Sequence, residues 1–413
     1  MSVYIVGGAK FNHLSRAVTA VTMSPGTDSL YPMAGLYDDR PVVPAKFSAV
    51  GAGSYVHADL NVLVNGDLES LPVSPATTPP GWTASAGTFT RDTVIKNSGA
   101  ASAKLVHTAA TNAYQDVTCR SGEFLKIEWA IYGGGGAIAA AVQVQNKDTG
   151  KYLRTDGIWG AAQDLDSQTT AAWKTGSKQF TVEAVAETLT DLTVLRVLVT
   201  LSASGTIQFD DMYLYPATDL CAVFGSNVGK LLTPEFRSGV SGSTLEATLT
   251  PRQPSFFARL SAPIYQRYLR LTLSGTAYNV PWLGELVFSQ MVTLSRTPND
   301  VSFEWRERQA RLETPGGAQW ATPRGAGAIR SATLKIKYST VAEYEQSRDL
   351  MYRRARGGVY PLIVIPTVAD AAEIIFGRLT EDVTYNFISG ATSAVPYREA
   401  QFVLAEEPVP TMV

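Results

Sequence analysis

The feature that most constrains the fold of this chain is that residues 1 to about 330 show no helical period of any length. Instead, this part of the chain has many short runs rich in Val, Thr, Tyr and Leu, which Gly, Pro, Asn and Asp separate. Residues 192–201 and 268–273 alternate apolar and polar positions, as strands do when one face is buried and the other meets water. The sequence therefore predicts a body made mainly of β-structure.

The pattern changes after about residue 330. Residues 332–338 alternate as a strand, and Thr340 and Glu343 then have the spacing of a capping box, while Gly357 and Gly358 supply a stop. These signals predict one helix over about residues 341–355. Strand-like runs bounded by turn residues follow at 359–366, 373–379 and 399–404. We therefore expect a C-terminal β-domain that carries a single helix.

Length, charge and cysteine content narrow the class of protein. A chain of 413 residues is long enough for two to four domains of about 150 residues each. Its 35 Lys and Arg against 37 Asp and Glu give a net charge of −2, so nucleic acid is not expected as a main partner. With 3 histidines and 2 cysteines, a disulfide framework and a zinc cage are both unexpected, and Cys119 and Cys221 are predicted to be free structural thiols.

The sequence shows neither the pattern of a membrane-spanning segment nor that of a signal peptide. No stretch approaches 18 uninterrupted apolar residues, and residues 1–8 lack the basic start and long apolar core of a signal peptide. We therefore expect no membrane insertion. We also expect synthesis in a cytosol, without export directed by the N-terminus of this sequence.

A first resemblance covers about residues 61–216. Asn65, Gly66 and Glu69 form an N-G-x-x-E motif, a Gly-Trp pair ends at Trp82, and residues 206–216 form a strand-like run with an Asp-Asp pair. This order resembles the jelly-roll carbohydrate-binding modules, which begin and end in the same way. The resemblance implies a two-sheet jelly roll in this part of the chain.

A second resemblance covers the segments on either side of the jelly roll. Residues 20–25 and 36–41 resemble the opening of a discoidin-like sandwich, and its continuation and closing strands resemble residues 219–227, 267–271 and 284–286. The resemblance implies a discoidin-like domain that the jelly roll interrupts. Such an insertion is physically possible because both kinds of sandwich keep their termini close together at one end.

A third resemblance covers the C-terminal third. Residues 330–334, the expected helix, and residues 358–366, 375–379 and 396–402 resemble in pattern the distal-tail and baseplate proteins of long-tailed bacteriophages. In that family, a β-sandwich with one flanking helix forms a ring that continues the tail tube. The resemblance implies a homo-oligomeric ring of six or three copies, contacts with tail-tube and baseplate hub proteins, and a place in the virion.

Together, these resemblances predict a mainly β, multi-domain chain with three parts. The parts are a split discoidin-like sandwich over residues 1–60 and 217–291, an inserted jelly roll over residues 61–216, and a ring-forming β-domain over residues 292–413.

The sequence contains no convincing catalytic signature. Residues 239–243 place a glycine one position too early for a G-x-S-x-G nucleophile turn, and the glycine run 133–136 is not followed by Lys-Ser or Lys-Thr. Neighbours on a strand point to opposite faces, so an adjacent pair such as Asp210-Asp211 cannot by itself flank a glycosidic bond as acid and nucleophile. We therefore predict that the chain is not an enzyme.

Sugar binding by such modules depends on exposed aromatic rings, whose faces complement the CH-rich face of a pyranose. Tyr152 and Trp159 lie in a run of turn residues and are the first candidates, and Trp82 is a third. Trp129 lies in the alternating run 127–131, so it is expected in the core instead.

The jelly-roll resemblance also brings Glu69, on the first strand, close to Asp210 and Asp211 on the last strand. Carboxylate and carbonyl oxygens could there form a shell of six to eight ligands around a structural calcium ion. The alternative is that these acids cap turns and bind no metal. No other cofactor is expected.

These expectations favour a structural component of a phage tail tip or baseplate, with a host-surface polysaccharide as a further expected contact. The alternative is a carbohydrate-binding accessory protein of a polysaccharide-degrading system. The expected helix-bearing C-terminal domain and the missing signal peptide argue against this alternative.

Overall fold

The computed structural model describes most of the chain as strands and short turns. The described residues are 4–7, 20–24, 45–46, 54–69, 79–136, 138–183, 192–226, 232–237, 244–246, 250–252, 255–273, 282–293, 298–313, 319–338, 362–365, 375–380, 384–388 and 397–406. They contain no helix, and thus no helix that could cross a membrane, so the prediction of a mainly β chain is confirmed. The helix expected over residues 341–355 lies outside the described residues.

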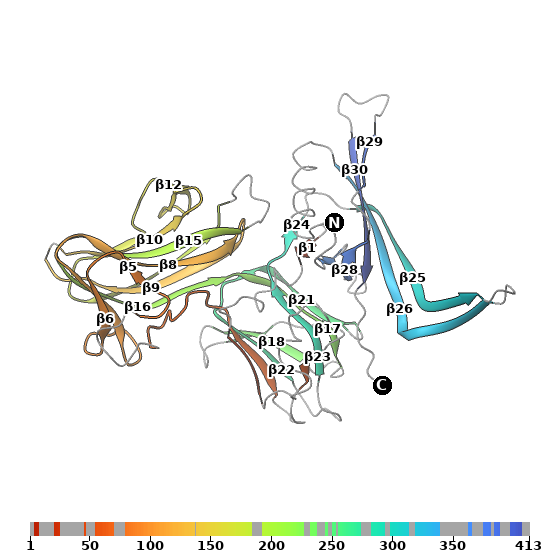
Figure 1. Cartoon of the computed structure of the whole chain (residues 1–413), viewed down its shortest axis with the longest axis horizontal. Coiled ribbons are helices and arrows are strands. Elements are labelled where there is room, and N and C mark those ends of the chain that lie inside the picture. Colours follow the sequence, from red (N-terminus) through yellow and green to blue (C-terminus); the bar gives the residue numbers. More distant parts are fainter. Residues whose placement is uncertain are drawn as a thin grey trace.

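The strands of the described ranges form five sheets, which we group as an outer sandwich, a central sandwich and a C-terminal sheet (Figure 1). The outer sandwich has a seven-stranded sheet with the order β12-β11-β10-β15-β8-β5, in which β13 also pairs with β10. Its strands are β5 (Thr83–Ala84), β8 (Thr111–Arg120), β10 (Ala140–Asn146), β11 (Tyr152–Leu153), β12 (Trp159–Gly160), β13 (Asp166–Gln168) and β15 (Leu192–Leu201).

The second sheet of the outer sandwich has five strands in the order β14-β9-β16-β7-β6. These are β6 (Thr88–Asp92), β7 (Ser102–His107), β9 (Phe124–Tyr132), β14 (Trp173–Thr181) and β16 (Gly205–Pro216). Apolar side chains from the two sheets form one buried cluster, in which the ring of Phe209 stacks on Phe89 with centroids 5.6 Å apart. The predicted strand over residues 192–201 is confirmed as β15, and its alternate residues Leu195, Val197 and Val199 enter this core.

The central sandwich is built from strands on both sides of the outer sandwich in sequence. One sheet has the order β20-β21-β17-β23-β3 and the other the order β19-β18-β22-β4-β2. The strands are β2 (Ala20–Ser24), β3 (Ala45–Lys46), β4 (Tyr55–Asp59), β17 (Thr218–Ser226), β18 (Leu232–Arg237), β19 (Thr244–Glu246), β20 (Thr250–Arg252), β21 (Ser255–Ile264), β22 (Tyr268–Leu273) and β23 (Trp282–Ser289). The strand expected over residues 268–273 is thus confirmed, whereas the discoidin-like interpretation and the domain boundaries stay predictions.

The C-terminal sheet has eight strands in the order β24-β1-β27-β28-β30-β26-β25, with β29 also paired to β30. They are β1 (Tyr4–Gly7), β24 (Val292–Thr293), β25 (Pro298–Glu313), β26 (Gln319–Tyr338), β27 (Leu362–Ile365), β28 (Ile375–Leu379), β29 (Thr384–Ile388) and β30 (Tyr397–Glu406). Strand β1 pairs with β27, although the sequence analysis assigned residues 1–60 to the interrupted sandwich. A strand of four residues carries no local signal of a partner more than 300 residues away, which explains the difference.

Strands β25 and β26 form a hairpin that extends beyond its sheet (Figure 1). Among the described strands, Ser331–Tyr338 of β26 also pair with β30, whereas residues 305–313 and 319–330 pair only with each other. We call these two stretches the free ribbon. At its base, the guanidinium of Arg330 is buried and forms an ion pair with Glu406 at 2.9 Å.

A buried apolar cluster joins the central sandwich to the C-terminal sheet. Phe224 of β17 stacks on Phe376 of β28 with ring centroids 4.6 Å apart, and Val287 and Met291 lie in the same cluster as Ile363 of β27. The two parts therefore share a core rather than meeting through a linker.

Candidate functional site

The outer face of the seven-stranded sheet carries a cross-strand row of polar and aromatic residues. Tyr152 lies opposite Gln145, Gln145 opposite Arg196, and Arg196 opposite Asp116, in β11, β10, β15 and β8 respectively. Their neighbours along the strands point inward and are buried, so these four side chains face solvent. Tyr114, two residues before Asp116, lies on the same face. We call this surface the tyrosine face.

Ion pairs hold the centre of the tyrosine face in a fixed arrangement. Arg196 donates from Nε to Oδ1 of Asp116 at 2.7 Å and from a terminal nitrogen to Oδ2 at 2.9 Å, and its guanidinium carbon lies 3.9 Å from the ring centroid of Tyr114. Lys147 donates to the same carboxylate at 2.8 Å. The hydrogen bond from Arg196 lowers the pKa of Asp116, which keeps the carboxylate ionised. The guanidinium is therefore held over an aromatic ring before any ligand arrives.

The rest of the tyrosine face offers amide groups and a second ring. Gln143 lies two residues before Gln145 on β10, and its Nε2 donates to Oδ1 of Asp164 at 2.7 Å, which leaves its carbonyl oxygen as an acceptor. Tyr152 is partly exposed beside Arg196. Ring faces bordered by directional donors and acceptors suit a ligand that has both CH-rich faces and hydroxyl groups.

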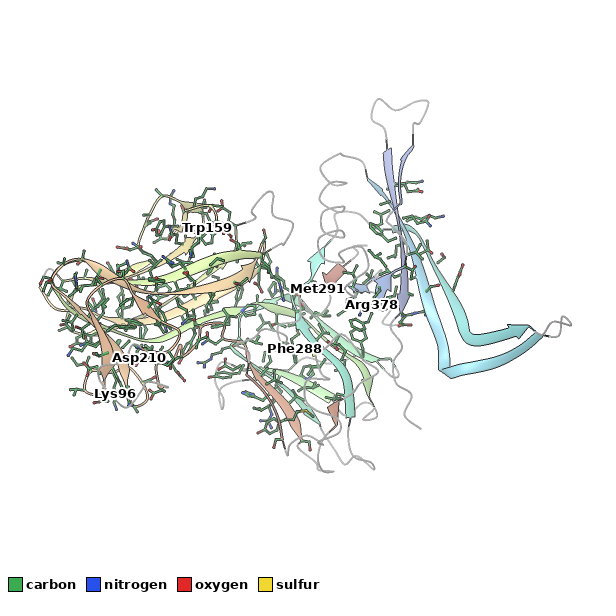
Figure 2. All side chains as sticks on the ribbon, in the orientation of Figure 1. Lys96, Trp159, Asp210, Phe288, Met291 and Arg378 are labelled. Atoms are coloured by element: carbon green, nitrogen blue, oxygen red, sulfur yellow. The ribbon has the colours of Figure 1, made fainter. Side chains whose placement is uncertain are left out.

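Trp159 does not join Tyr152 on this face. Tyr152 pairs with Gly160 and Leu153 pairs with Trp159, so the indole lies on the same side as the buried Leu153. Figure 2 labels Trp159 in the outer sandwich. Its Nε1 donates to the carbonyl oxygen of Thr181 at 2.8 Å, and its ring meets Phe180 edge-on with centroids 5.9 Å apart. Trp159 thus ties the β11–β12 hairpin to β14 of the opposite sheet and closes one edge of the sandwich.

Trp82 is a core residue, which corrects its assignment as a ligand candidate. Only 3% of its surface is exposed, and its ring lies 5.1 Å from that of Phe209 in the buried cluster. The expected core position of Trp129 is confirmed by its exposure of 5%.

Sequence reasoning counted Tyr114 among the available aromatic residues but did not select it for the candidate site, and it did not identify Arg196. The alternation of β8 was readable in principle, but Gln115 occupies an inward position where an apolar residue is expected. Its amide accepts from the N–H of Val64 at 2.7 Å and donates to the Val64 carbonyl at 3.0 Å, so the buried polar group is satisfied. Because position 115 is polar, the alternation of apolar and polar residues along β8 is interrupted there, and the sequence alone did not show that Tyr114 faces outward.

The three acids expected to bind calcium all contact one loop, residues 97–101, which we call the clamped loop. Asp210 is fully buried, and its Oδ2 accepts from the N–H of Asn97 at 3.0 Å and of Ser98 at 3.2 Å. Asp211 accepts from the Asn97 amide and the Ser98 hydroxyl, each at 2.8 Å. Glu69 contacts the other end of the loop, where its Oε1 accepts from the N–H of Ala100 at 2.8 Å.

This site places negative charge in a partly buried environment. Burial, together with the negative charge of Asp211, raises the pKa of Asp210 to about 7. In the described part of the chain, no Lys or Arg forms an ion pair with Asp210, Asp211 or Glu69. A bound cation would offset this charge.

The side chains alone do not form a calcium shell. Within the described ranges, no three His, Cys, Asp or Glu side chains are grouped closely enough to hold a metal ion. A calcium ion held by Glu69, Asp210 and Asp211 would need carbonyl oxygens as further ligands. The observed hydrogen bonds from N–H groups fit the alternative that the acids cap the loop, so calcium binding stays a prediction.

Comparison with known proteins gives structural similarity only. No family model and no curated protein sequence matches the chain. Among solved structures, the enzymatically active domain of bacteriophage CBA120 tailspike protein 4 is 16% identical with a TM-score of 0.27, over 38% of this chain and 21% of that one. The chain thus spans about a fifth of the length of that tailspike domain.

Two carbohydrate-binding modules are similar over most of their own length. TmCBM61, solved in complex with β-1,4-galactotriose, is 15% identical with a TM-score of 0.25, over 38% of this chain and 98% of that one. A family 16 carbohydrate-binding module is 17% identical with a TM-score of 0.28, over 37% of this chain and 99% of that one. At these identities and TM-scores, the matches assign no function to the chain.

Proposed function

We propose that this chain is a structural subunit of a phage tail tip or baseplate, which assembles with copies of itself into a ring of six or three and is not an enzyme. The observation that carries the proposal is the free ribbon of β25 and β26. Two strands that pair only with each other are marginally stable in water, and unpaired strand edges tend to pair with another chain. A closed ring of identical subunits covers each edge with a neighbour.

The base of the ribbon supports this reading. Arg330 and Glu406 fix the point where β26 leaves its pairing with β30, so the ribbon leaves the sheet in a defined direction. A neighbouring copy could then receive it in one orientation. In this proposal, tail-tube and hub proteins are the other partners, and the protein resides in the virion.

Size measurement of the full chain tests the proposal. Light scattering and native mass spectrometry are expected to show six or three copies, and electron microscopy is expected to show a ring. A variant in which a short turn replaces residues 311–321 shortens the ribbon without touching Arg330 and is expected to be a folded monomer. A full-length chain that stays monomeric at every concentration, and in the intact particle, would contradict the proposal.

A second candidate function, glycan binding, is favoured by the tyrosine face. The rings of Tyr114 and Tyr152, the amides of Gln143 and Gln145, and the guanidinium of Arg196 provide the contacts that a neutral polysaccharide uses. In a tail tip, this face would contact the host surface. In the alternative, an accessory protein of a polysaccharide-degrading system, the same face would act in a chain that does not form rings.

Binding assays with purified polysaccharides test this second function. Affinity electrophoresis of the full chain through gels that contain host-surface or plant polysaccharides is expected to show retardation by at least one of them. Combined with the size measurement, retardation of a ring supports the tail-tip reading, and retardation of a monomer supports the accessory-protein reading. Free migration in every gel would argue against glycan binding.

A further inference from the structure

The chain crosses between the outer and the central sandwich twice, without a linker at either crossing. On the way out, Leu60 lies in the core of the central sandwich and Val62 in the core of the outer one. On the way back, Leu214 belongs to the outer core, and Tyr215, the next residue, belongs to the central core. A change of core within one or two residues leaves no free chain about which the sandwiches could turn.

The two crossings are bonded to each other. The N–H of Val62 donates to the carbonyl oxygen of Leu214 at 2.7 Å, and the N–H of Leu214 donates to Oδ1 of Asn61 at 2.9 Å. Nearby, Gly66 accepts from the N–H of Met212 at 2.8 Å, and a Cβ on this glycine would lie 2.1 Å from the Met212 carbonyl oxygen. The Asn-Gly turn therefore packs directly against the returning strand.

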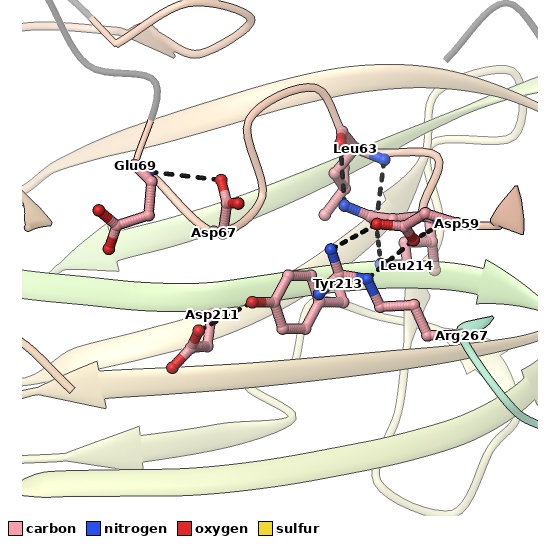
Figure 3. A network of polar contacts seen from close by, with 9 residues as sticks. Asp59, Leu63, Asp67, Glu69, Asp211, Tyr213, Leu214 and Arg267 are labelled. Atoms are coloured by element: carbon pink, nitrogen blue, oxygen red, sulfur yellow. Dashed lines mark hydrogen bonds and ion pairs between the residues drawn. The ribbon is translucent and has the colours of Figure 1, made fainter. Parts of the chain in front are cut away.

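Arg267 of the central sandwich lies across both crossings (Figure 3). It donates to the Asp59 carboxylate from Nε at 2.8 Å and from a terminal nitrogen at 2.6 Å, and its guanidinium carbon lies 3.8 Å from the ring centroid of Tyr213 on β16. The ring centroid of Tyr268 lies 4.7 Å from the same guanidinium carbon. Asp59 belongs to the outgoing strand and Tyr213 to the returning one, so one side chain connects the two.

The connection continues into the outer sandwich. The hydroxyl of Tyr213 donates to Oδ1 of Asp211 at 2.8 Å, and Asp211 binds the clamped loop. A separate contact lies at the start of β9, where the N–H of Phe124 donates to Oε1 of Gln290 in the central part at 2.9 Å. The sandwiches are thus joined at two distinct places, which restrains rotation about either one.

We propose that Arg267, clasped between Asp59 and Tyr213, is a lock that makes the outer and central sandwiches move as one rigid body. Only 14% of the Arg267 side chain and 23% of the Asp59 side chain are exposed. A bidentate, charge-assisted pair that is shielded from water in this way is costly to break. Removing either partner leaves the charge of the other partly buried and unpaired. The lock does not depend on either proposed function, but it would hold the tyrosine face in one direction relative to the C-terminal sheet.

Distance measurement between spin labels tests the lock in the full chain. Thr118 of the outer sandwich and Thr22 of the central sandwich are exposed and can be replaced by labelled cysteines, whereas the native Cys119 and Cys221 are buried. Labelled chains are diluted with an excess of unlabelled chain, so that contacts between copies do not contribute. The expected result is one narrow distance distribution, which R267A broadens.

The chain offers a matched control for this variant. Arg196 also forms a bidentate pair with an aspartate and covers a tyrosine ring at 3.9 Å, but all three residues lie in one sheet of the outer sandwich. R196A is therefore expected to leave the distribution narrow. Should R267A fail to fold, R267K keeps the charge, loses the planar fork and is expected to give intermediate broadening. A broad distribution in the parent chain, or a narrow one in every Arg267 variant, would overturn the proposal.

Discussion

At the scale of single residues, Asp116 organises the tyrosine face. Its carboxylate binds Arg196 and Lys147 together, and the planar guanidinium then lies over Tyr114. Without Asp116, both cations would be free to turn toward water, since long side chains gain rotamer freedom when released. The carboxylate of Asp116 therefore orders the side chains around it and does not itself need to contact a ligand.

The first prediction concerns the two tyrosines of this face. Replacing Tyr114 or Tyr152 by Ala is expected to cost about 1–3 kcal/mol in affinity for a bound polysaccharide, because each removes one aromatic contact. Melting temperature should change little. Isothermal titration calorimetry measures the affinity, and Y132A, a partly exposed tyrosine on the other sheet, serves as the control. W159A is expected to show the opposite pattern, a lower melting temperature with affinity retained.

The second prediction concerns pH. The hydrogen bond from Arg196 lowers the pKa of Asp116 below its ordinary value near 3.8, so the contribution of the pair to stability is present above about pH 4 and is lost as pH falls below it. The partners are partly exposed, so the expected effect is about 0.2–1 kcal/mol. Thermal unfolding between pH 6 and pH 3 measures it against D116N, which should lose less stability over this range. Equal pH dependence in both proteins would contradict the assignment.

At the scale of elements, strands with clear alternation were predictable and short or interrupted ones were not. The sequence indicated β15 and β22 because their apolar residues recur at every second position. Strands β11 and β12 have two residues each, too few to show any period, and their pairing alone determines that Tyr152 and Trp159 face opposite ways. Sequence reasoning could therefore identify only part of the candidate site.

The third prediction concerns the clamped loop. Gly99 has a φ of +56°, and a Cβ there would lie 1.8 Å from Oε1 of Glu69. G99A is therefore expected to destabilise the fold by about 1–3 kcal/mol, measured by chemical unfolding. Gly122 has a φ of +74° but open space around its Cβ, so G122A reports backbone strain alone and should cost less. Equal losses of stability in G99A and G122A would show that the contact with Glu69 adds nothing to the cost of a side chain at position 99.

The fourth prediction concerns calcium at the same loop. If Glu69, Asp210 and Asp211 hold the ion, calcium is expected to raise the melting temperature of metal-free protein, because a ligand that binds only the folded state stabilises it. D210N should abolish the shift, and a chelator should reverse it. Metal analysis of purified protein gives an independent measurement. No bound calcium, together with no effect of the chelator, would leave capping of the loop as the role of these acids.

At the scale of the whole molecule, the parts are nested rather than strung in series. The C-terminal sheet includes β1 as well as β24 to β30, so the central sandwich lies in sequence between strands of that sheet. The outer sandwich in turn lies between β4 and β17 of the central one. Each inserted part is therefore attached by two chain crossings, and two attachments restrain orientation more than a single linker does. Phe224 and Phe376 add a shared core at the inner junction.

The fifth prediction follows from this nesting. Residues 61–216 are expected to fold alone, because the outer sandwich has its own two-sheet core. Excision removes the contacts of the lock, of Gln290 and of Tyr215 with the central core, but leaves that two-sheet core complete. The fragment should give a β-type circular dichroism spectrum and one cooperative thermal transition. Its stability should fall below that of the same sandwich in the full chain, because Tyr213 would no longer be covered by Arg267. An aggregated fragment, or one without a cooperative transition, would show that the outer sandwich depends on the central one for its fold.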